Sequence, residues 1–229
     1  MNRPYVLLSC AVSIDGYIDD ATEQRLHLSN EADFDRVDEA RSGCDAILVG
    51  AVTIRADDPR LLIRAPGRQQ ARLGRGLPAH PLKATVTGGG DLDPSARFFT
   101  AGDGAKVVYA ASGAVTKARV RLGALAEVVD AGDPVDLAVM LADLATRGVA
   151  RLMVEGGGAM HTQFLTAGLA DELHLAIAPF FIGDPRAPRF TYPGAFPHGP
   201  ANPARLTETT QLGDVVVLRY ALSPRYPGT

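Results

Sequence analysis

The chain has 229 residues, of which 46% are hydrophobic and 21% charged, and its formal net charge is −3. These proportions are typical of a soluble globular domain and exclude a disordered chain. The slight acidic excess disfavours a sequence-independent nucleic-acid binder, and no apolar stretch is long enough to span a membrane. Two cysteines, Cys10 and Cys44, are too few for a disulfide scaffold or a Cys-rich zinc site, and they fit a reducing cytoplasm.

Short apolar runs alternate with helical patterns along the first two thirds of the chain. This alternation predicts an α/β protein built around a largely parallel sheet. Most of the runs are apolar throughout, as expected for strands that helices cover on both faces. The expected strands are Val6–Val12, Ala46–Val49, Leu82–Thr87, Lys106–Ala110, Ala126–Val129 and Arg151–Glu155.

Two helices have clear boundaries in the sequence. The first is expected to begin after a cap at Ser29 or Asn30 and to end near Gly43. The second is expected to have Asp133 as its cap and Pro134 in its first turn, and to end at Gly148. Weaker helical patterns follow Ala114 and Gly158.

The pattern changes in the last third of the chain. Residues alternate over Glu172–Ile177, which predicts a strand with one more polar face. Gly183–Pro203 is rich in proline and predicts a loop, and Asp214–Leu222 predicts a final strand, so the late strands are expected to add antiparallel pairs to the sheet. Arg64–His80 is expected to be irregular. No second core pattern begins anywhere, which favours one domain over residues 1–229.

The strongest local motif is the run from Glu155 to Gly158, at the end of an apolar strand and the beginning of a helix. Three consecutive glycines allow a ligand to approach the backbone, and the first N–H groups of the helix point at an anion. This geometry suits the pyrophosphate of a dinucleotide, although the run does not match the G-x-G-x-x-G pattern. The alternative is a tight turn between strand and helix.

A second strand-to-helix junction contains Gly50 and Thr53, which could bind phosphate or amide oxygens. The adjacent carboxylates Asp57 and Asp58 suggest a metal site at first sight. Neighbouring side chains diverge, however, and no histidine or third carboxylate lies at ligand spacing, so a capping or loop-closing role is favoured. The five histidines show no zinc-binding spacing, and no hydrolase or reactive-thiol motif is present.

Several motifs occur together in one known order: Ala11–Gly16, Asp45–Gly50 with Thr53, Ala56–Leu61, Val154–Gly157, Leu169–Leu173 and Ile177–Pro179. In this combination the chain resembles the reductase domain family of riboflavin biosynthesis, whose activity is that of 5-amino-6-(5-phosphoribosylamino)uracil reductase. The resemblance covers nearly the whole chain. It implies a three-layer dihydrofolate-reductase-like fold, with a mostly parallel central sheet and antiparallel C-terminal strands.

The resemblance also implies a homodimeric oxidoreductase that uses NADPH to reduce a phosphorylated pyrimidine. Hydride would pass to an imine carbon formed when the ribose ring of the substrate opens. Glu155 and Asp57 are the candidate catalytic residues, and Glu155 would accept hydrogen bonds from the pyrimidine. The implied substrate contacts are Arg41, Leu61, Arg64 and Glu155. The implied cofactor contacts are Ala11, Thr53, Asp57, Ser112, Gly157, Gly158, Ala159, Met160, His161, Thr162 and Gln163, to which the glycine arguments above add Gly50 and Gly156.

Three positions depart from the family pattern: Ser9, Arg25 and His27 stand where a lysine, a small hydroxyl residue and an aromatic residue are common. The chain also lacks the deaminase domain that is often fused to this reductase. These departures favour one alternative, a paralogue that reduces another pterin, pyrimidine or imine with NADPH. A second alternative is a non-catalytic nucleotide-binding or structural module, against which the intact Gly156–Gly158 run and Thr53 speak. Arg41 and Arg64 favour a phosphorylated substrate, because a guanidinium fork matches phosphate oxygens.

Overall fold

The computed structural model describes residues 3–22, 24 and 26–228, so Arg25 lies outside the described residues. These residues form two compact units. Unit 1 comprises Asp38–Met153 and the N-terminal residues up to Pro4, and unit 2 comprises Tyr5–Val37 and the chain from Val154 onward. The expectation of one reductase domain over 1–229 stays a prediction. Within the described ranges, no helix combines the length and the apolar character needed to cross a bilayer.

Unit 1 contains a parallel sheet whose strands follow the order β5-β4-β3-β2-β6. The pairs β2–β3, β3–β4 and β4–β5 are all parallel. Each strand predicted in this unit is present to within one residue at either end, and all except β5 are mostly buried. The strands are β2 (Ala46–Gly50), β3 (Leu82–Thr87), β4 (Lys106–Ala110), β5 (Glu127–Asp130) and β6 (Arg151–Val154).

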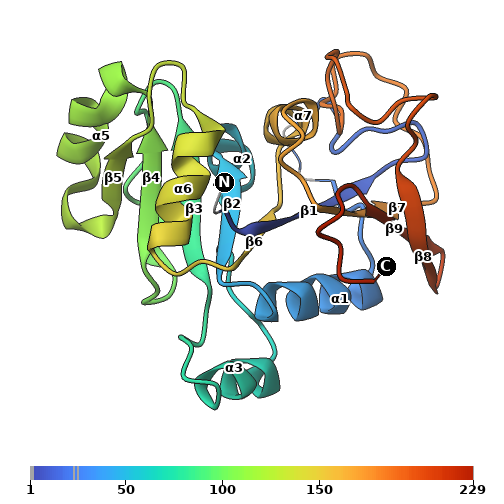
Figure 1. Ribbon diagram of the computed structural model, residues 1–229, viewed down its shortest axis with the longest axis horizontal. Helices are drawn as coiled ribbons and strands as arrows, with labels where there is room; N and C mark the ends of the chain where they lie inside the picture. Colours follow the sequence, from blue (N-terminus) through green and yellow to red (C-terminus); the bar gives the residue numbers. More distant parts are fainter. Residues whose placement is uncertain (1–2, 23, 25, 229) are drawn as a thin grey trace. The chain divides into compact units, whose positions relative to one another are not determined.

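Helices connect and cover these strands (Figure 1). The phenol of Tyr109 on β4 donates a 2.7 Å hydrogen bond to Asp143 on α6, which attaches that helix to the sheet. The division between the units falls inside α1 (Glu31–Ser42), which begins after Asn30, as predicted. The Asn30 side chain accepts a 3.0 Å hydrogen bond from the N–H of Asp33. The other helices of unit 1 are α2 (Ala51–Asp57), α3 (Pro66–Leu73), α4 (Arg97–Thr100), α5 (Val115–Leu122) and α6 (Leu137–Thr146).

The predicted start of α6 at Asp133 is wrong. Asp136 caps the helix instead, and its carboxylate accepts a 2.7 Å hydrogen bond from the N–H of Ala138. The Asp136 N–H donates to the carbonyl of Ala131, also at 2.7 Å, and so closes a tight turn around Gly132, which has φ +90°. Two aspartates three residues apart are both plausible caps in sequence, and this backbone turn decides between them.

The segment Arg64–His80 is not entirely irregular, because it contains α3. Helix α3 begins with Pro66 at its first position and lies apart from the sheet of unit 1 (Figure 1). Arg72 anchors it with an almost fully buried guanidinium, which donates to the carbonyls of Ser42, Cys44 and Pro78 at 2.7–2.9 Å. The segment is rich in Arg, Gly and Pro, and its helix is anchored by a charged residue instead of an apolar one, so the sequence did not indicate a helix here.

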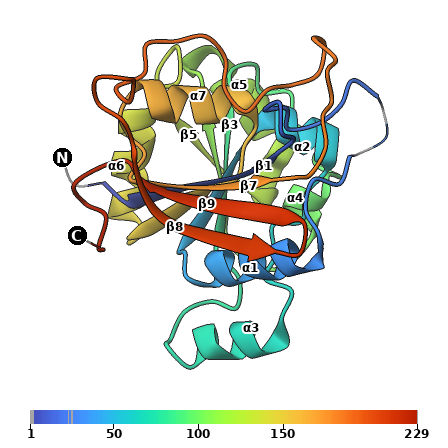
Figure 2. The ribbon, with the colours of Figure 1, turned by 90° about the vertical axis from the view of Figure 1, so that its right-hand side faces the viewer.

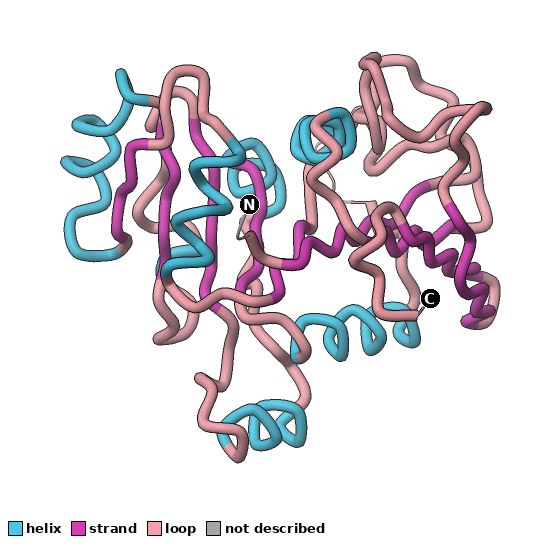
Figure 3. Tube along the Cα trace, in the orientation of Figure 1, coloured by secondary structure: helices cyan, strands magenta, loops and turns pink. Residues whose placement is uncertain are grey.

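Unit 2 contains four strands in the order β1-β7-β9-β8. Strand β1 (Tyr5–Val12) pairs with β7 (Glu172–Ile177) in parallel, whereas β9 (Val215–Ala221) is antiparallel to β7 and to β8 (Arg205–Leu212). The predicted antiparallel C-terminal strands are therefore confirmed. Strand β8 was not predicted, because it is a largely exposed edge strand of mixed polar residues; Figure 2 shows its hairpin with β9 face on. Between β7 and β8 the chain is mostly loop, as predicted (Figure 3).

The more polar side of β7 is buried, not exposed as a polar face would suggest. Glu172 and His174 are 5% and 4% exposed. The Glu172 carboxylate accepts from the Tyr5 hydroxyl at 3.0 Å and contacts His174 Nε2 at 2.7 Å, while His174 Nδ1 lies 3.3 Å from a guanidinium nitrogen of Arg36. Burial lowers the pKa of His174. Partners from β1 and α1 thus replace the water that a polar face normally contacts.

Candidate active site

Three of the predicted cofactor positions, Gly50, Thr53 and Ser112, lie at or just after the carboxyl ends of the parallel strands in unit 1. Gly50 ends β2 and caps α2 in an extended conformation, and Thr53 lies one turn into α2, half-buried. Gly88 follows β3 directly, and a Cβ there would meet no atom within 4 Å. Ser112 follows β4. Open α/β sheets bind ligands beyond the carboxyl ends of their strands. The glycine run that starts at Gly88 was missed, although its place after a strand is visible in the sequence.

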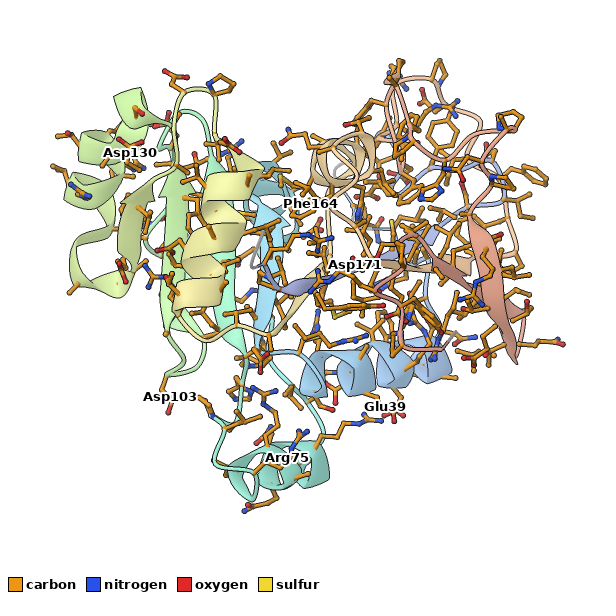
Figure 4. The ribbon with its side chains drawn as sticks, in the orientation of Figure 1. Glu39, Arg75, Asp103, Asp130, Phe164 and Asp171 are labelled. Carbon is orange, nitrogen blue, oxygen red and sulfur yellow. The ribbon has the colours of Figure 1, made fainter. Side chains whose placement is uncertain are left out.

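Ser112 is held in place by the end of β5. Its hydroxyl donates a 2.7 Å hydrogen bond to Asp130, and its N–H donates to the carbonyl of Gly132 at 3.1 Å. Asp130 is the last residue of β5 (Figure 4) and also accepts from the N–H of Gly132 at 3.0 Å. This N–H and the Ser112 hydroxyl lower the pKa of Asp130, so the carboxylate is ionised at neutral pH.

The adjacent carboxylates Asp57 and Asp58 diverge. Asp58 has φ +42° at the end of α2, and its carboxylate accepts from the backbone N–H and the Nε of Arg97 at 2.6 and 2.8 Å. The loop-closing interpretation is therefore confirmed for Asp58. Asp57 is the last residue of α2 and half-buried. In the part of the chain that the structure describes, no group of three or more His, Cys, Asp or Glu is arranged to hold a metal ion.

The predicted substrate contacts of unit 1 lie together at the end of α1. Arg41 donates from Nη1 to the carbonyl of Leu62 at 3.2 Å, which places it beside the segment that carries Leu61 and Arg64. Leu61 is buried with φ +49°, and the Arg64 side chain is exposed. Asp38, one turn before Arg41, accepts the backbone N–H of Arg64. Sequence reasoning missed Asp38, since a buried helical aspartate looks like any surface carboxylate in the sequence.

In unit 2, the glycine run forms the predicted turn between a strand and a helix. Glu155 follows β6 and is half-buried, and Gly156 has φ +124°, a conformation that favours glycine. The peptide bond between Gly156 and Gly157 is cis. Helix α7 (Gly158–Thr166) begins after Gly157, and no side chain caps it. Its N-terminal N–H groups and helix dipole therefore suit an anion.

Gly158 and Thr162 hold the loop that follows β7. A Cβ on Gly158 would lie 2.0 Å from the carbonyl oxygen of Arg189 and 3.0 Å from the ring of Tyr192. The Thr162 hydroxyl donates to the Gly158 carbonyl at 2.7 Å and accepts from the Tyr192 N–H at 2.9 Å. The third glycine of the run thus allows close packing of two protein segments.

His161 lies behind the glycine run. It is fully buried, and neither ring nitrogen has a hydrogen-bond partner among the described residues. Its Nε2 is 3.5 Å from the point that a Cβ on Gly156 would occupy, and its ring centroid is 5.2 Å from that of Phe190. Burial lowers the pKa of His161 to about 4, so the imidazole is neutral at physiological pH.

The remaining predicted cofactor positions of unit 2 differ in exposure. Ala159 and Gln163 face solvent from α7, whereas Met160 is 5% exposed. Ala11 lies on β1 opposite Ala176 and is partly buried. Of these four side chains, Met160 is the most buried.

Two of the three departures from the family pattern are described. Ser9 is 5% exposed on β1, in register with His174. His27 is exposed, and its ring lies edge-on to Phe34 at a centroid distance of 6.3 Å.

Comparisons with known proteins identify consistent relatives. The family model described as the RibD C-terminal domain matches residues 4–218. The chain is 36% identical over 188 residues to a 2,5-diamino-6-ribosylamino-4(3H)-pyrimidinone 5′-phosphate reductase of Archaeoglobus fulgidus, covering 81% of this chain and 85% of the relative. It is 40% identical over 183 residues to the reductase of the same name from Methanothermobacter thermautotrophicus, covering 79% and 80%.

Solved structures support the fold. A pyrimidine reductase-like protein of Corynebacterium diphtheriae superimposes with a TM-score of 0.79 at 21% identity, covering 96% of this chain and 92% of that one. Dihydrofolate reductase of Enterococcus faecalis superimposes with a TM-score of 0.52 at 12% identity, with 95% of each chain covered. The expected dihydrofolate-reductase-like fold is confirmed.

Proposed function

Because the chain belongs to the RibD C-terminal domain family, we propose that it reduces a phosphorylated ribosylaminopyrimidine in riboflavin biosynthesis. The observation that carries this proposal is the 36% and 40% identity to two reductases of this type, of which the chain spans four fifths or more. The chain is an oxidoreductase. The alternative of a paralogue that reduces another pterin, pyrimidine or imine is not favoured by these relatives.

The substrate that we propose is the 2,5-diamino-pyrimidinone form, which the two relatives are named for, and not the deaminated uracil form. The two compounds differ at C2, which carries an amino group in the first and an oxygen in the second. A carboxylate accepts well from an amino group and a neighbouring ring N–H, but a C2 oxygen would repel it. Glu155 is the proposed acceptor, which would favour the diamino form.

NADPH is the proposed cofactor, and the chain's own features fit a dinucleotide. The uncapped N-terminus of α7 suits its pyrophosphate, and the extended glycine at the end of β2 permits a close approach of the backbone. Thr53, Asp57 and Ser112 of unit 1 and Ala11 of unit 2 are further proposed contacts. When bound, the nicotinamide supplies the hydride. The preference for NADPH over NADH is supported by the family resemblance, and the two dissociation constants at one salt concentration test it.

The chain's residues would act mainly by positioning. Arg41 and Arg64 would bind the substrate phosphate, while Glu155 would orient the pyrimidine so that the carbon of the ring-opened imine accepts hydride and becomes part of a ribityl chain. Orientation of two reactants is itself a large part of such a rate. Water or the substrate itself would supply the proton to the imine nitrogen. Asp57 is the second candidate catalytic residue.

We also place the enzyme in the reducing cytoplasm as a homodimer. Cys10 and Cys44 are not joined by a disulfide, which is compatible with that compartment, and the family resemblance supports the dimer. Light scattering after size-exclusion chromatography tests the oligomeric state.

The function is tested by following NADPH oxidation with the purified protein and both pyrimidine phosphates. We expect turnover of the diamino form with a kcat/KM about tenfold or more above that of the uracil form, because one carboxylate–amino hydrogen bond is lost. The gene should also restore growth of a strain that lacks the riboflavin reductase. NADPH binding without turnover of either compound would point to the paralogue. Absence of NADPH binding by fluorescence quenching would point to a non-catalytic module.

A further inference from the structure

The segment Leu61–Ala65 of unit 1 belongs to no helix or strand, yet much of it is buried. Leu61 and Ile63 are 2% and 1% exposed, while Arg64 between the buried positions and α3 is exposed. Leu61 has φ +49°, a left-handed conformation that a branched side chain disfavours. A backbone of this kind persists only where its surroundings hold it.

Side chains, and not a sheet, satisfy the backbone of this segment. Arg41 donates to the Leu62 carbonyl at 3.2 Å. The N–H of Ile63 donates to Nδ1 of His80 at 3.2 Å, and the Ile63 carbonyl accepts from the Gln69 side chain at 2.8 Å. The segment is therefore fixed from α1, from α3 and from the residues before β3.

Asp38 makes the most extensive of these contacts. The residue is 2% exposed, and its two carboxylate oxygens accept the consecutive N–H groups of Arg64 and Ala65, the latter at 3.1 Å. Oδ2 also accepts from Arg68 Nη1 at 3.0 Å. Burial raises the pKa of Asp38, but the two N–H groups and Arg68 outweigh it, so the pKa lies below the ordinary value. The carboxylate is ionised and fully engaged.

Asp38 and Arg41 lie three residues apart on α1, and such residues share one face of a helix. One side chain holds the backbone of Arg64, and the other holds the carbonyl two residues earlier. A single helix face therefore fixes both arginines that the proposed function assigns to the substrate phosphate. The main chains of Arg41 and Arg64 are therefore held at fixed positions relative to each other, and mainly their side-chain rotamers can still change.

We propose that Asp38 is a positioning residue that presents Arg64 to the substrate phosphate by binding the Arg64 and Ala65 main chain. The inference rests on the proposed function, in which Arg64 binds that phosphate. Asp38 itself does not contact the substrate. Its effect should therefore depend on the phosphate and on the presence of Arg64, whereas a merely structural aspartate would affect every substrate alike.

The test compares Asp38→Asn with the parent on the phosphorylated substrate and its dephosphorylated analogue. Asparagine keeps the size of the side chain, but its amide NH₂ group would face the N–H of either Arg64 or Ala65. Two donors cannot form a hydrogen bond, so one of the two backbone contacts is lost. We expect KM for the phosphorylated substrate to rise about tenfold, which is the loss of roughly one charged hydrogen bond. The kcat, the KM of the analogue and the Kd of NADPH should change less than about twofold, the scatter of a neutral change.

Arg68→Gln is the matched control, because it removes the ion pair of Asp38 and leaves both backbone contacts. It should leave both KM values near those of the parent. In the Arg64→Gln background, Asp38→Asn should raise KM no further, since residues that act through one contact are not additive. Equal losses on both substrates, or additive effects with Arg64→Gln, would overturn the inference.

Failure of the proposed function has a different signature. If Arg64→Gln itself affects both substrates alike, the phosphate assignment falls and takes this inference with it. If Arg64→Gln discriminates and Asp38→Asn does not, only the inference falls. Should Asp38→Asn not fold, Ala65→Pro removes one N–H donor at a residue whose φ of −72° proline adopts. It should raise KM about threefold for the phosphorylated substrate alone, as a weaker version of the same loss; an unchanged KM overturns the inference.

Discussion

Replacement of Gly157 by valine tests whether the N-terminus of α7 binds the cofactor. Gly157 has φ −81° and ψ −164°, and the peptide bond that precedes it is cis. Valine would add methyl groups beside the first N–H groups of the helix, where the pyrophosphate is proposed to bind. We therefore expect loss of cofactor affinity, and a separate measurement of stability distinguishes this loss from unfolding.

The size of the effect follows from the contacts at risk. Two N–H groups that bind a charged phosphate contribute about 1.5–3 kcal/mol each. A loss of about 3 kcal/mol or more corresponds to a rise in Kd of about a hundredfold or more. Enhancement of NADPH fluorescence measures Kd, and thermal unfolding of the free protein measures stability.

Gly158→Ala is the contrasting variant, because its Cβ would lie 2.0 Å from the Arg189 carbonyl oxygen. The loop must move, at a cost of about 1–3 kcal/mol for overpacking. For a chain of this length each kcal/mol lowers Tm by about 2–4 °C. A Gly157→Val protein that binds NADPH as the parent does would refute the cofactor assignment of α7. An unchanged Tm for Gly158→Ala would refute the packing argument.

Three further outcomes are expected. Removal of Arg41 or Arg64 should raise KM for the phosphorylated substrate about ten- to a hundredfold, for the loss of a charged hydrogen bond, and equal losses on a dephosphorylated analogue in steady-state assays would show that the arginines serve the fold. Glu155→Gln should lower kcat/KM in NADPH-oxidation assays and leave the Kd of NADPH nearly unchanged; unchanged turnover would make Glu155 a loop-stabilising carboxylate. The folded pKa of His161, about 4, lies below its ordinary value of 6.5, so the native state binds fewer protons than the unfolded state between these values. The free energy of unfolding that depends on a neutral His161 is fully present above pH 6.5 and is lost as the pH falls towards 4. Between pH 7 and pH 5, the free energy of unfolding in urea should therefore change less for His161→Leu than for the parent. An equal change in both proteins would contradict the burial argument.

The parallel strands were predictable because burial on both faces leaves a continuous apolar run, which few other structures produce. Strand β8 was not predictable on these grounds. Its residues are mostly exposed, so pairing with β9 by backbone hydrogen bonds determines it, and backbone pairing leaves no sequence pattern. The cap of α6 was misassigned for a similar reason: Asp133 and Asp136 are chemically equivalent, and a main-chain turn chooses between them.

The residues of the candidate site likewise fall into those that the sequence could indicate and those that only the fold reveals. Motifs that depend on local conformation, such as Gly50 and the glycine run after β6, are visible in the sequence because a turn restricts the residue type. Asp38 and His80 act through contacts 26 and 17 residues away in the chain, and their residue types are common on surfaces. Only the fold reveals that both hold one segment.

The buried pair on β7 has a consequence for how unit 2 reaches a single strand alignment. Strand β7 is aligned with β1 through Ser9 and with β9 through Arg219, both opposite His174. A slip by one residue would turn Glu172 and His174 to the other face, away from the Tyr5 hydroxyl and Arg36. A buried polar group that loses its hydrogen-bond partner costs about 1–3 kcal/mol. The buried polar pair Glu172 and His174 therefore specifies the register of β7 and disfavours misaligned strand pairings.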